Sequence, residues 1–358
     1  MRRAFPAAAA LALAVLTTAC GTDDNSARLG ARRSSTATVP WANDAAVVSG
    51  AGATFPATLV QEWIKQYRGL APGVTINYQP IGSGAGIQQL TSRTVDFAGS
   101  DVPLKAGEVE ATGGPGAVVQ VPWTAGGVAV EYNLPGVGDL RLSPEALAGI
   151  FAGGVTRWND PAIKADNPNA ALPAAGIQVV HRSDGSGTTQ VFTDYLRAAA
   201  PQIWTFPPGK DWPADTAGTG AKGSDGVTAS VKQSPGAIGY AEPSYPKQAG
   251  LSMASIRNAA GRFLKPTADA VSAALAAAKV NPEGTLTLNF TAPSAEAYPI
   301  SSASYVMFYR SAPDPAKDTA LRHFVAWAIT DGQGLAEGLD YAPLPEPLRA
   351  GALGAVKL

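Results

Sequence analysis

The chain has 358 residues, of which 46% are hydrophobic, which is enough to bury a large core and to form two domains. This composition excludes a disordered protein, and the formal net charge of −1 excludes a general electrostatic attraction to nucleic acid. The 39 glycines and 29 prolines predict many tight turns.

The N-terminus has the features of an export signal. Arg2 and Arg3 precede an apolar stretch of small residues that ends at Cys20 and is too short to span a membrane. Cys20 is the only cysteine, so no internal disulfide can form. Its position resembles the lipidation site of bacterial lipoproteins, although these usually have leucine where this chain has Thr17. Residues 1–20 are therefore predicted to be a lipoprotein-type signal peptide, with ordinary secretion as the alternative.

The rest of the chain alternates strand and helix patterns after a polar segment. Residues 21–46 are small and polar without a period, and we expect them to form a flexible tether. Beyond them, short β-branched runs alternate with helical spacing, which predicts α/β sheets. The expected strands are Val74–Gln79, Val95–Asp101, Gly126–Asn133 and Ile177–Arg182.

Three predicted helices begin with glycine and a hydroxyl-bearing residue. The first follows Thr54, its expected N-cap; the second begins at Ser83; the third begins near Thr188. The last two starts each contain Gly-Ser-Gly. A helix N-terminus has free N–H groups and a partial positive charge. Three such ends favour a single anion bound where they converge.

Five motifs, spread across the chain, resemble those of one family. They are GAGATFPA, YQPIGSGAGIQQL, TVDFAGSDVPL, RSDGSGTTQVFTDYL and PGAIGYAE. In this order they closely resemble the substrate-binding protein of the bacterial high-affinity phosphate ABC importer. The resemblance implies a periplasmic-binding-protein-like fold of class II, in which two crossover strands join two α/β lobes and phosphate binds in the cleft. It also implies a protein that delivers phosphate to a membrane permease, without catalysis, cofactor or metal.

The family's phosphate contacts fall on positions that this chain shares. The implied contacts are Thr54, Phe55, Ser83, Asp101, Arg182, Ser186, Gly187 and Thr188. One departure is Gly84, because some members have a second serine there.

Asp101 is the expected selectivity residue. An ionised carboxylate only accepts hydrogen bonds, so it favours the P–OH group of phosphate and repels sulfate, which carries no proton at neutral pH. The alternative is a cap or turn residue before Pro103.

Arg182 is the expected cationic contact. Its planar guanidinium suits phosphate oxygens, and Asp184 is close enough in sequence to hold it in place. The alternative for this stretch is an Arg182–Asp184 surface ion pair beside a helix that Ser186 caps.

Other classes of function fit less well. GTGAKG at residues 218–223 matches a dinucleotide fingerprint but follows a turn-rich segment instead of a strand. No serine has the glycines of a nucleophile elbow, and two histidines with one cysteine do not make an ordinary zinc site. We expect His181 to pack or face solvent and His323 to lie on a helix surface. Sulfate, molybdate or an organic phosphate remains an alternative ligand, whereas an adhesion module does not explain the helix starts.

The expected crossovers divide the chain into lobes. Lobe one comprises residues 47–124 and 297–358, lobe two comprises residues 125–296, and residues 201–225 form a long surface excursion of lobe two. We expect an exported monomer, anchored by lipid to the outer face of the cytoplasmic membrane. Its partners are inorganic phosphate and the permease subunits, and we expect no nucleic-acid partner.

Overall fold

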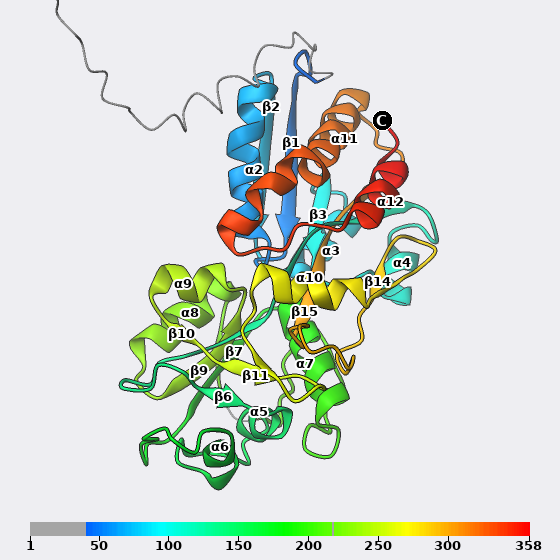
Figure 1. Cartoon of the computed structure of the whole chain (residues 1–358). Helices are drawn as coiled ribbons and strands as arrows, with labels where there is room; N and C mark the ends of the chain where they lie inside the picture. The colour runs from blue at the N-terminus through cyan, green and yellow to red at the C-terminus, as the bar shows by residue number, and fades with distance from the viewer. Residues whose placement is uncertain (1–40, 217) are drawn as a thin grey trace, which may run out of the picture. The chain divides into compact units, whose positions relative to one another are not determined.

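Two five-stranded sheets dominate the computed structural model, which describes residues 41–216 and 218–358 (Figure 1). Cys20 and the rest of the expected signal peptide lie outside the described residues. The described structure begins at Trp41, whose ring packs against Tyr67 and His323. None of the helices in the described ranges is long and apolar enough to cross a bilayer.

The first sheet has the strand order β2-β1-β3-β15-β4. These strands are β1 (Ala46–Gly52), β2 (Val74–Pro80), β3 (Phe97–Ser100), β4 (Val118–Gly127) and β15 (Ser301–Tyr309). Strand β1 is parallel to β2 and β3, and β15 is antiparallel to β3 and β4. The helices that pack against this sheet are α2 (Ala57–Leu70), α3 (Ser83–Thr91), α10 (Ala268–Ala276), α11 (Pro315–Ile329) and α12 (Glu346–Val356).

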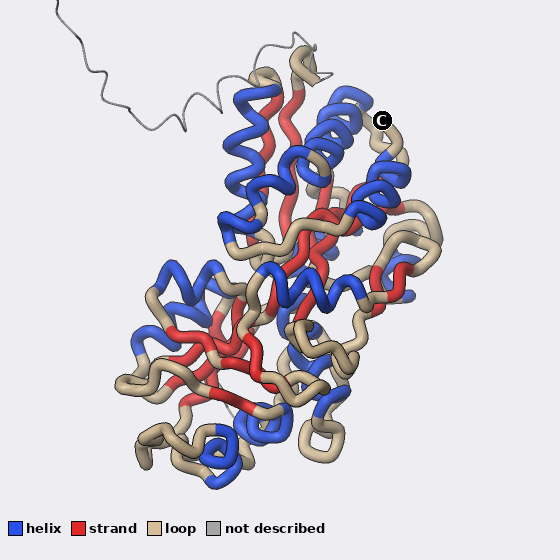
Figure 2. Tube along the Cα trace, in the orientation of Figure 1, coloured by secondary structure: helices blue, strands red, loops and turns tan. Residues whose placement is uncertain are grey.

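The second sheet has the order β10-β5-β9-β7-β8. Its strands are β5 (Ala129–Tyr132), β7 (Gln178–Arg182), β8 (Thr219–Ala221), β9 (Ala237–Ala241) and β10 (Ser252–Met253). Strand β7 is parallel to β8 and β9. Helix α8 (Gly223–Gln233) packs across β5, β7 and β9, and α7 (Gly187–Ala199) packs against α5 (Pro144–Phe151). Figure 2 shows the helices around the strands of both sheets.

Shorter elements complete the two lobes, each lobe being one large sheet with its helices. A three-stranded sheet contains β6 (Arg141–Leu142), β11 (Ser255–Arg257) and β12 (Phe263–Leu264), and a hairpin contains β13 (Lys279–Val280) and β14 (Leu286–Thr287). The remaining helices are α4 (Ala106–Ala111), α6 (Pro161–Asp166), α9 (Ser244–Ala249), and the 3₁₀ helices η2 (Asp331–Leu335) and η3 (Glu337–Leu339).

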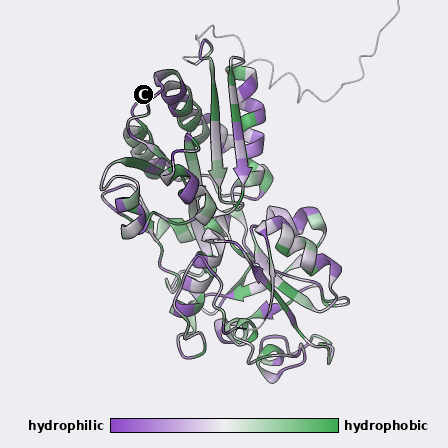
Figure 3. Cartoon of the chain, turned by 180° about the vertical axis from the view of Figure 1, so that it is seen from behind, coloured by the Kyte–Doolittle hydropathy of each residue, from purple (hydrophilic) through white to green (hydrophobic). Residues whose placement is uncertain are grey.

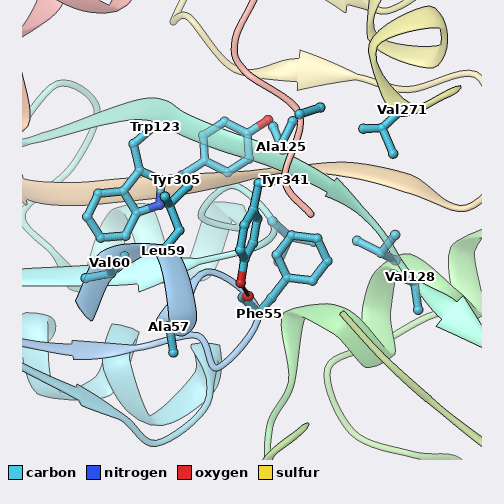
Figure 4. Close-up of a cluster of buried hydrophobic side chains, with 14 of the residues drawn as sticks. Phe55, Ala57, Leu59, Val60, Trp123, Ala125, Val128, Val271, Tyr305 and Tyr341 are labelled. Atoms are coloured by element: carbon cyan, nitrogen blue, oxygen red, sulfur yellow. Dashed lines mark hydrogen bonds between the residues drawn. The ribbon is translucent and has the colours of Figure 1, made fainter. Parts of the chain in front are cut away.

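The hydrophobic patterns account for these elements. In α2 the buried residues Leu59, Trp63 and Tyr67 recur every four positions, which places them on one face of the helix. Hydrophilic residues occupy other positions of α2, as expected for an amphipathic surface helix (Figure 3). Under this helix, Phe55 and Trp123 belong to a continuous core of buried side chains (Figure 4).

Three of the four expected strands are present with small shifts in their ends, and the fourth is divided between two strands. The run from Gly126 to Asn133 contains the end of β4 and all of β5, so Val128 alone separates a strand of the first sheet from one of the second. After β12 the chain reaches α10, which packs against β4 and β15 of the first sheet. The lobe limits at residues 124 and 297 stay a prediction.

Thr54 is not a helix cap, and that expectation is wrong. Helix α2 begins only at Ala57, its N-cap is Pro56, and no side chain caps it. The Thr54 carbonyl accepts a hydrogen bond from the Ala57 N–H, while its hydroxyl contacts the second lobe. The Thr54 side chain is therefore free for another function.

Candidate functional site

The expected contact residues follow the carboxyl ends of parallel strands in both sheets. Thr54 follows β1, Asp101 follows β3, and Arg182 is the last residue of β7. Side chains at such strand ends lie where α/β sheets place their ligands. Ser83 is the first residue of α3, and Gly187 is the first residue of α7.

Direct hydrogen bonds connect these segments across the two lobes. The Gly187 N–H donates to Ser83 Oγ over 3.1 Å, and Thr188 Oγ1 donates to Asp101 Oδ2 over 3.2 Å. The approach at Gly187 is so close that a Cβ there would lie 2.6 Å from Ser83 Oγ and 2.8 Å from Asp101 Cβ. Only glycine fits this position without displacing the opposite lobe.

Gly84, where the family resemblance is weakest, also lies at this contact. Its N–H donates to the Gly185 carbonyl over 2.8 Å, and a Cβ at Gly84 would lie 3.2 Å from Gly185 Cα. The missing serine therefore allows the backbones of the two lobes to approach closely here.

The segment Thr54–Phe55 is held by three hydroxyl groups. Thr54 Oγ1 lies 2.8 Å from Ser224 Oγ, and the Tyr245 hydroxyl donates to the Thr54 carbonyl over 2.6 Å. The Tyr341 hydroxyl donates to the Phe55 carbonyl over 2.7 Å, while the Phe55 ring packs edge-on against the Tyr341 ring (Figure 4). The Phe55 side chain thus belongs to the core, which leaves its backbone N–H as the group that can contact a ligand.

Arg182 is buried, with 1% of its surface exposed, and is held by a carboxylate. Its Nε donates to Asp184 Oδ1 over 2.7 Å, and Nη2 donates to Asp184 Oδ2. Burial works to raise the pKa of Asp184, but the hydrogen bonds and charge of Arg182 outweigh it and lower that pKa below its ordinary value. The ion pair of the alternative interpretation is therefore present, but it is buried and not on the surface.

Ser186 caps α7, as the same alternative interpretation supposed. Its Oγ accepts a hydrogen bond from the Thr189 N–H over 3.1 Å. Its own N–H donates to the Lys210 carbonyl over 2.8 Å. Capping and ligand binding do not exclude each other, because a hydroxyl has one donor hydrogen in addition to its two lone pairs.

Asp101 is buried, with 2% of its surface exposed, and accepts two hydrogen bonds. Ser304 Oγ donates to Oδ1 over 2.9 Å and Thr188 Oγ1 donates to Oδ2. Burial raises the pKa of the Asp101 carboxyl to about 6, although the Ser304 hydrogen bond and the Arg182 charge act against this rise. This pKa lies below 7, so the carboxylate is mostly ionised at neutral pH and can accept a hydrogen bond from a ligand.

Ser224 contacts two of the candidate site residues, Thr54 and Arg182, and is not among the residues that the sequence motifs indicate. It lies on the first turn of α8, within the region expected to be a surface excursion. Gly223 and Ser224 precede the apolar pair Val227 and Val231, so the glycine-hydroxyl pattern was present here for a fourth time. The adjacent GTGAKG segment contains β8 and leads directly into α8.

The two histidines have structural contacts. His181 stacks on Trp212 with ring centroids 4.9 Å apart, in agreement with the expected packing role. His323 lies on α11 and is partly exposed, and its Nδ1 lies 2.6 Å from Asp44 Oδ2. Among residues 41–216 and 218–358 no group of histidine, cysteine and carboxylate side chains could hold a metal ion.

The site combines few charges with many neutral donors. One buried guanidinium and one buried carboxylate lie among hydroxyls and backbone N–H groups from both lobes. Such a set suits a small oxyanion, and the carboxylate would favour an anion that carries a proton.

Comparisons with known proteins agree with this chemistry. A family model described as "PBP superfamily domain" matches residues 37–332. A phosphate-binding protein PstS of Pasteurella multocida (strain Pm70) is 40% identical over 309 residues, covering 84% of this chain and 87% of that protein. A protein of the same name from Xylella fastidiosa (strain 9a5c) is 36% identical over 348 residues, covering 94% of this chain and 93% of that protein.

A solved structure is similar over most of the chain. It is described as a high affinity periplasmic phosphate-binding protein (PfluDING) bound with phosphate, and it is 25% identical with a TM-score of 0.70. The match covers 86% of this chain and 93% of that one.

Proposed function

The chain belongs to the PBP superfamily and, within it, to the PstS phosphate-binding proteins, and we propose on this basis that it binds inorganic phosphate. The resemblance indicated by the five motifs is thereby confirmed, together with the two-lobed α/β fold. The binding role is that of a carrier and not of an enzyme.

We propose that phosphate binds between the two lobes. Its contacts are the Thr54 hydroxyl, the Phe55 N–H, Ser83, Asp101, Arg182, Ser186, Gly187 and Thr188, with Asp184 holding Arg182. The observation that carries this proposal is the buried Asp101 carboxylate, which lies opposite the N-terminus of α7. A fully deprotonated oxyanion such as sulfate or molybdate would place charge against this carboxylate.

A ligand titration tests this function. The tryptophan fluorescence of the purified protein, which has seven tryptophans, is recorded during titration with phosphate, sulfate and a phosphate ester. We expect saturable binding of phosphate, weak binding of sulfate, and weak binding of the ester, because the closely packed lobes leave little space for a substituent. Preferred binding of sulfate or of the ester would contradict the proposal.

We further propose that the protein is exported and delivers phosphate to the membrane subunits of an ABC-type importer. The named relatives and the export signal support this role. A lipid on Cys20 would hold the protein, as a monomer, at the outer face of the cytoplasmic membrane.

Cys20→Ser tests the lipid anchor. The variant has no thiol to acylate, so it should appear in the culture medium, whereas the parent stays with the membrane fraction. Immunoblots of both fractions measure this distribution, and Ser26→Ala in the adjacent polar segment is the control. Retention of Cys20→Ser with the membrane as firmly as the parent would show that Cys20 is not the anchor.

A further inference from the structure

Ser224 lies between two of the proposed phosphate contacts. It is fully buried on the first turn of α8, and its Oγ is 2.8 Å from Thr54 Oγ1 and 3.5 Å from Arg182 Nη1. Helix α8 has Lys222 as its N-cap and no side-chain cap. The Ser224 hydroxyl is therefore not needed to cap its own helix, and its contacts are with the site.

Either hydroxyl of the Ser224–Thr54 pair can be the donor between them, and one arrangement satisfies every contact of this group. A guanidinium only donates, so Ser224 Oγ accepts from Arg182. The single hydrogen of Ser224 is then available for Thr54 Oγ1, which also accepts from the Ser224 backbone N–H over 3.3 Å. Both lone pairs of Thr54 Oγ1 are occupied in this arrangement, and its own hydrogen remains as a donor for a ligand.

We propose that Ser224 is a positioning residue that fixes the Thr54 hydroxyl as a hydrogen-bond donor towards the bound anion. This inference rests on the proposed phosphate-binding function. Phosphate oxygens other than the P–OH are acceptors, so a Thr54 hydroxyl turned the other way would present a lone pair to the anion. The Arg182 charge polarises the chain of hydrogen bonds and strengthens the last donor.

The chain of hydrogen bonds also connects the two lobes. Arg182 and Ser224 belong to the second lobe, whereas Thr54 belongs to the first. Ser224 can therefore orient the Thr54 hydroxyl only when the two lobes are in contact. The strength of the Thr54 hydroxyl as a hydrogen-bond donor thus depends on closure of the lobes.

A double-mutant cycle on phosphate affinity tests the inference. Ser224→Ala removes only the hydroxyl, and Thr54→Val removes the hydroxyl that it is proposed to orient while keeping a similar shape. We expect each single variant to bind phosphate about 3- to 10-fold more weakly, the effect of one hydrogen bond. Because Ser224 acts through Thr54, the double variant should bind no more weakly than Thr54→Val alone.

The matched control is Ser230→Ala on the same helix. Ser230 Oγ donates to the Gly226 carbonyl one turn earlier, away from the site, so this variant should bind phosphate like the parent. Thermal unfolding of each variant is measured as well. If Ser224→Ala unfolds at the temperature of the titration, Ser224→Cys replaces it, since a thiol is a much weaker hydrogen-bonding group.

The outcomes separate the inference from the proposed function. A parent that does not bind phosphate contradicts the proposed function. A parent that binds phosphate while Ser224→Ala or Thr54→Val binds it equally well overturns the inference, as do strictly additive effects in the double variant. Weakening by both single changes without further loss in the double variant supports it.

Discussion

Asp101 combines burial, ionisation and a position opposite the donors of the other lobe. Asp101→Asn keeps the size of the side chain but replaces one acceptor oxygen with an amide donor and removes the negative charge. Phosphate loses a charge-assisted hydrogen bond but also escapes repulsion, so its own affinity can move in either direction. Sulfate affinity should rise for two reasons: the repulsion by the carboxylate disappears, and the new amide can donate a hydrogen bond to a sulfate oxygen. We therefore expect the ratio of phosphate to sulfate affinity to fall by about tenfold or more.

Titration of parent and variant with both anions at equal ionic strength measures this ratio. Asp96→Asn is a suitable control, because Asp96 precedes the same strand but pairs with Lys317 away from the site. An unchanged ratio in Asp101→Asn would mean that Asp101 is only a turn residue.

Glu131 is a second buried carboxyl, and it has no role in the proposed site. It lies on β5, and its hydrogen-bond partner is the Thr228 hydroxyl of α8, 2.9 Å from Oε2. Burial raises its pKa to about 8 from an ordinary value of 4.5, despite the opposing hydrogen bond. Between these values the folded protein holds a proton that the unfolded chain has released, so the free energy of unfolding falls as the pH rises from about 4.5 to about 8.

Glu131→Gln should remove this part of the pH dependence. The amide keeps the shape and cannot ionise, so the loss of thermal stability between pH 6 and pH 9 should be smaller than in the parent. Part of the loss remains, since burial also raises the pKa of Glu242 to about 8. Unfolding temperatures at several pH values measure the effect, and Glu110→Gln at an exposed position is the control. Parallel pH curves for parent and Glu131→Gln would refute this account.

The segment between α7 and β8 is more than a surface excursion. Trp204 is fully buried, and Trp212 stacks on His181 of β7. Lys210, with only 9% of its surface exposed, forms an ion pair with Glu108 of α4 in the other lobe. The backbone carbonyl of Lys210 also accepts a hydrogen bond from the Ser186 N–H. The segment therefore supports a proposed phosphate contact and joins the two lobes.

Breaking this ion pair should weaken phosphate binding. Lys210→Met and Glu108→Gln each leave a partly buried charge without its partner in the closed state, which favours the open state. We expect each change to lower phosphate affinity about 2- to 10-fold. The double variant should bind phosphate at least as tightly as the single variant with the lower affinity. The exposed pair Lys65–Glu62 provides the control, with Lys65→Met expected to have no effect. Additive losses would show that the two residues act separately.

The elements with regular patterns could be predicted from the sequence, and the contacts between lobes could not. Local spacing predicts the strand that ends at Arg182, the strand that precedes Asp101, and the helix starts at Ser83 and Gly187. A hydroxyl near a helix start usually caps that helix, so local spacing predicts a capping role for Thr54. Its actual partner, Ser224, is 170 positions away, and such a pairing has no local sequence pattern.

Polar contacts join the two lobes of the described chain. Gly187 with Ser83, Thr188 with Asp101, and Ser224 with Thr54 each pair one residue from either lobe. Hydroxyl and N–H groups of this kind are well solvated when exposed, so their direct pairing gains little net free energy. An anion that accepts hydrogen bonds from both lobes adds the interaction that makes closure favourable.

Phosphate should therefore change the dimensions of the protein. A ligand shifts a two-state equilibrium only through its different affinity for the two states. The proposed phosphate contacts are complete only when Thr54, Ser83 and Asp101 lie opposite Arg182 and Gly187. We expect small-angle X-ray scattering to give a smaller radius of gyration with saturating phosphate than without ligand. Sulfate at the same ionic strength should leave the radius unchanged, because Asp101 disfavours it. An unchanged radius of gyration at saturating phosphate would mean that the lobes are already closed without ligand. Phosphate binding would then not drive closure, and this prediction would be wrong.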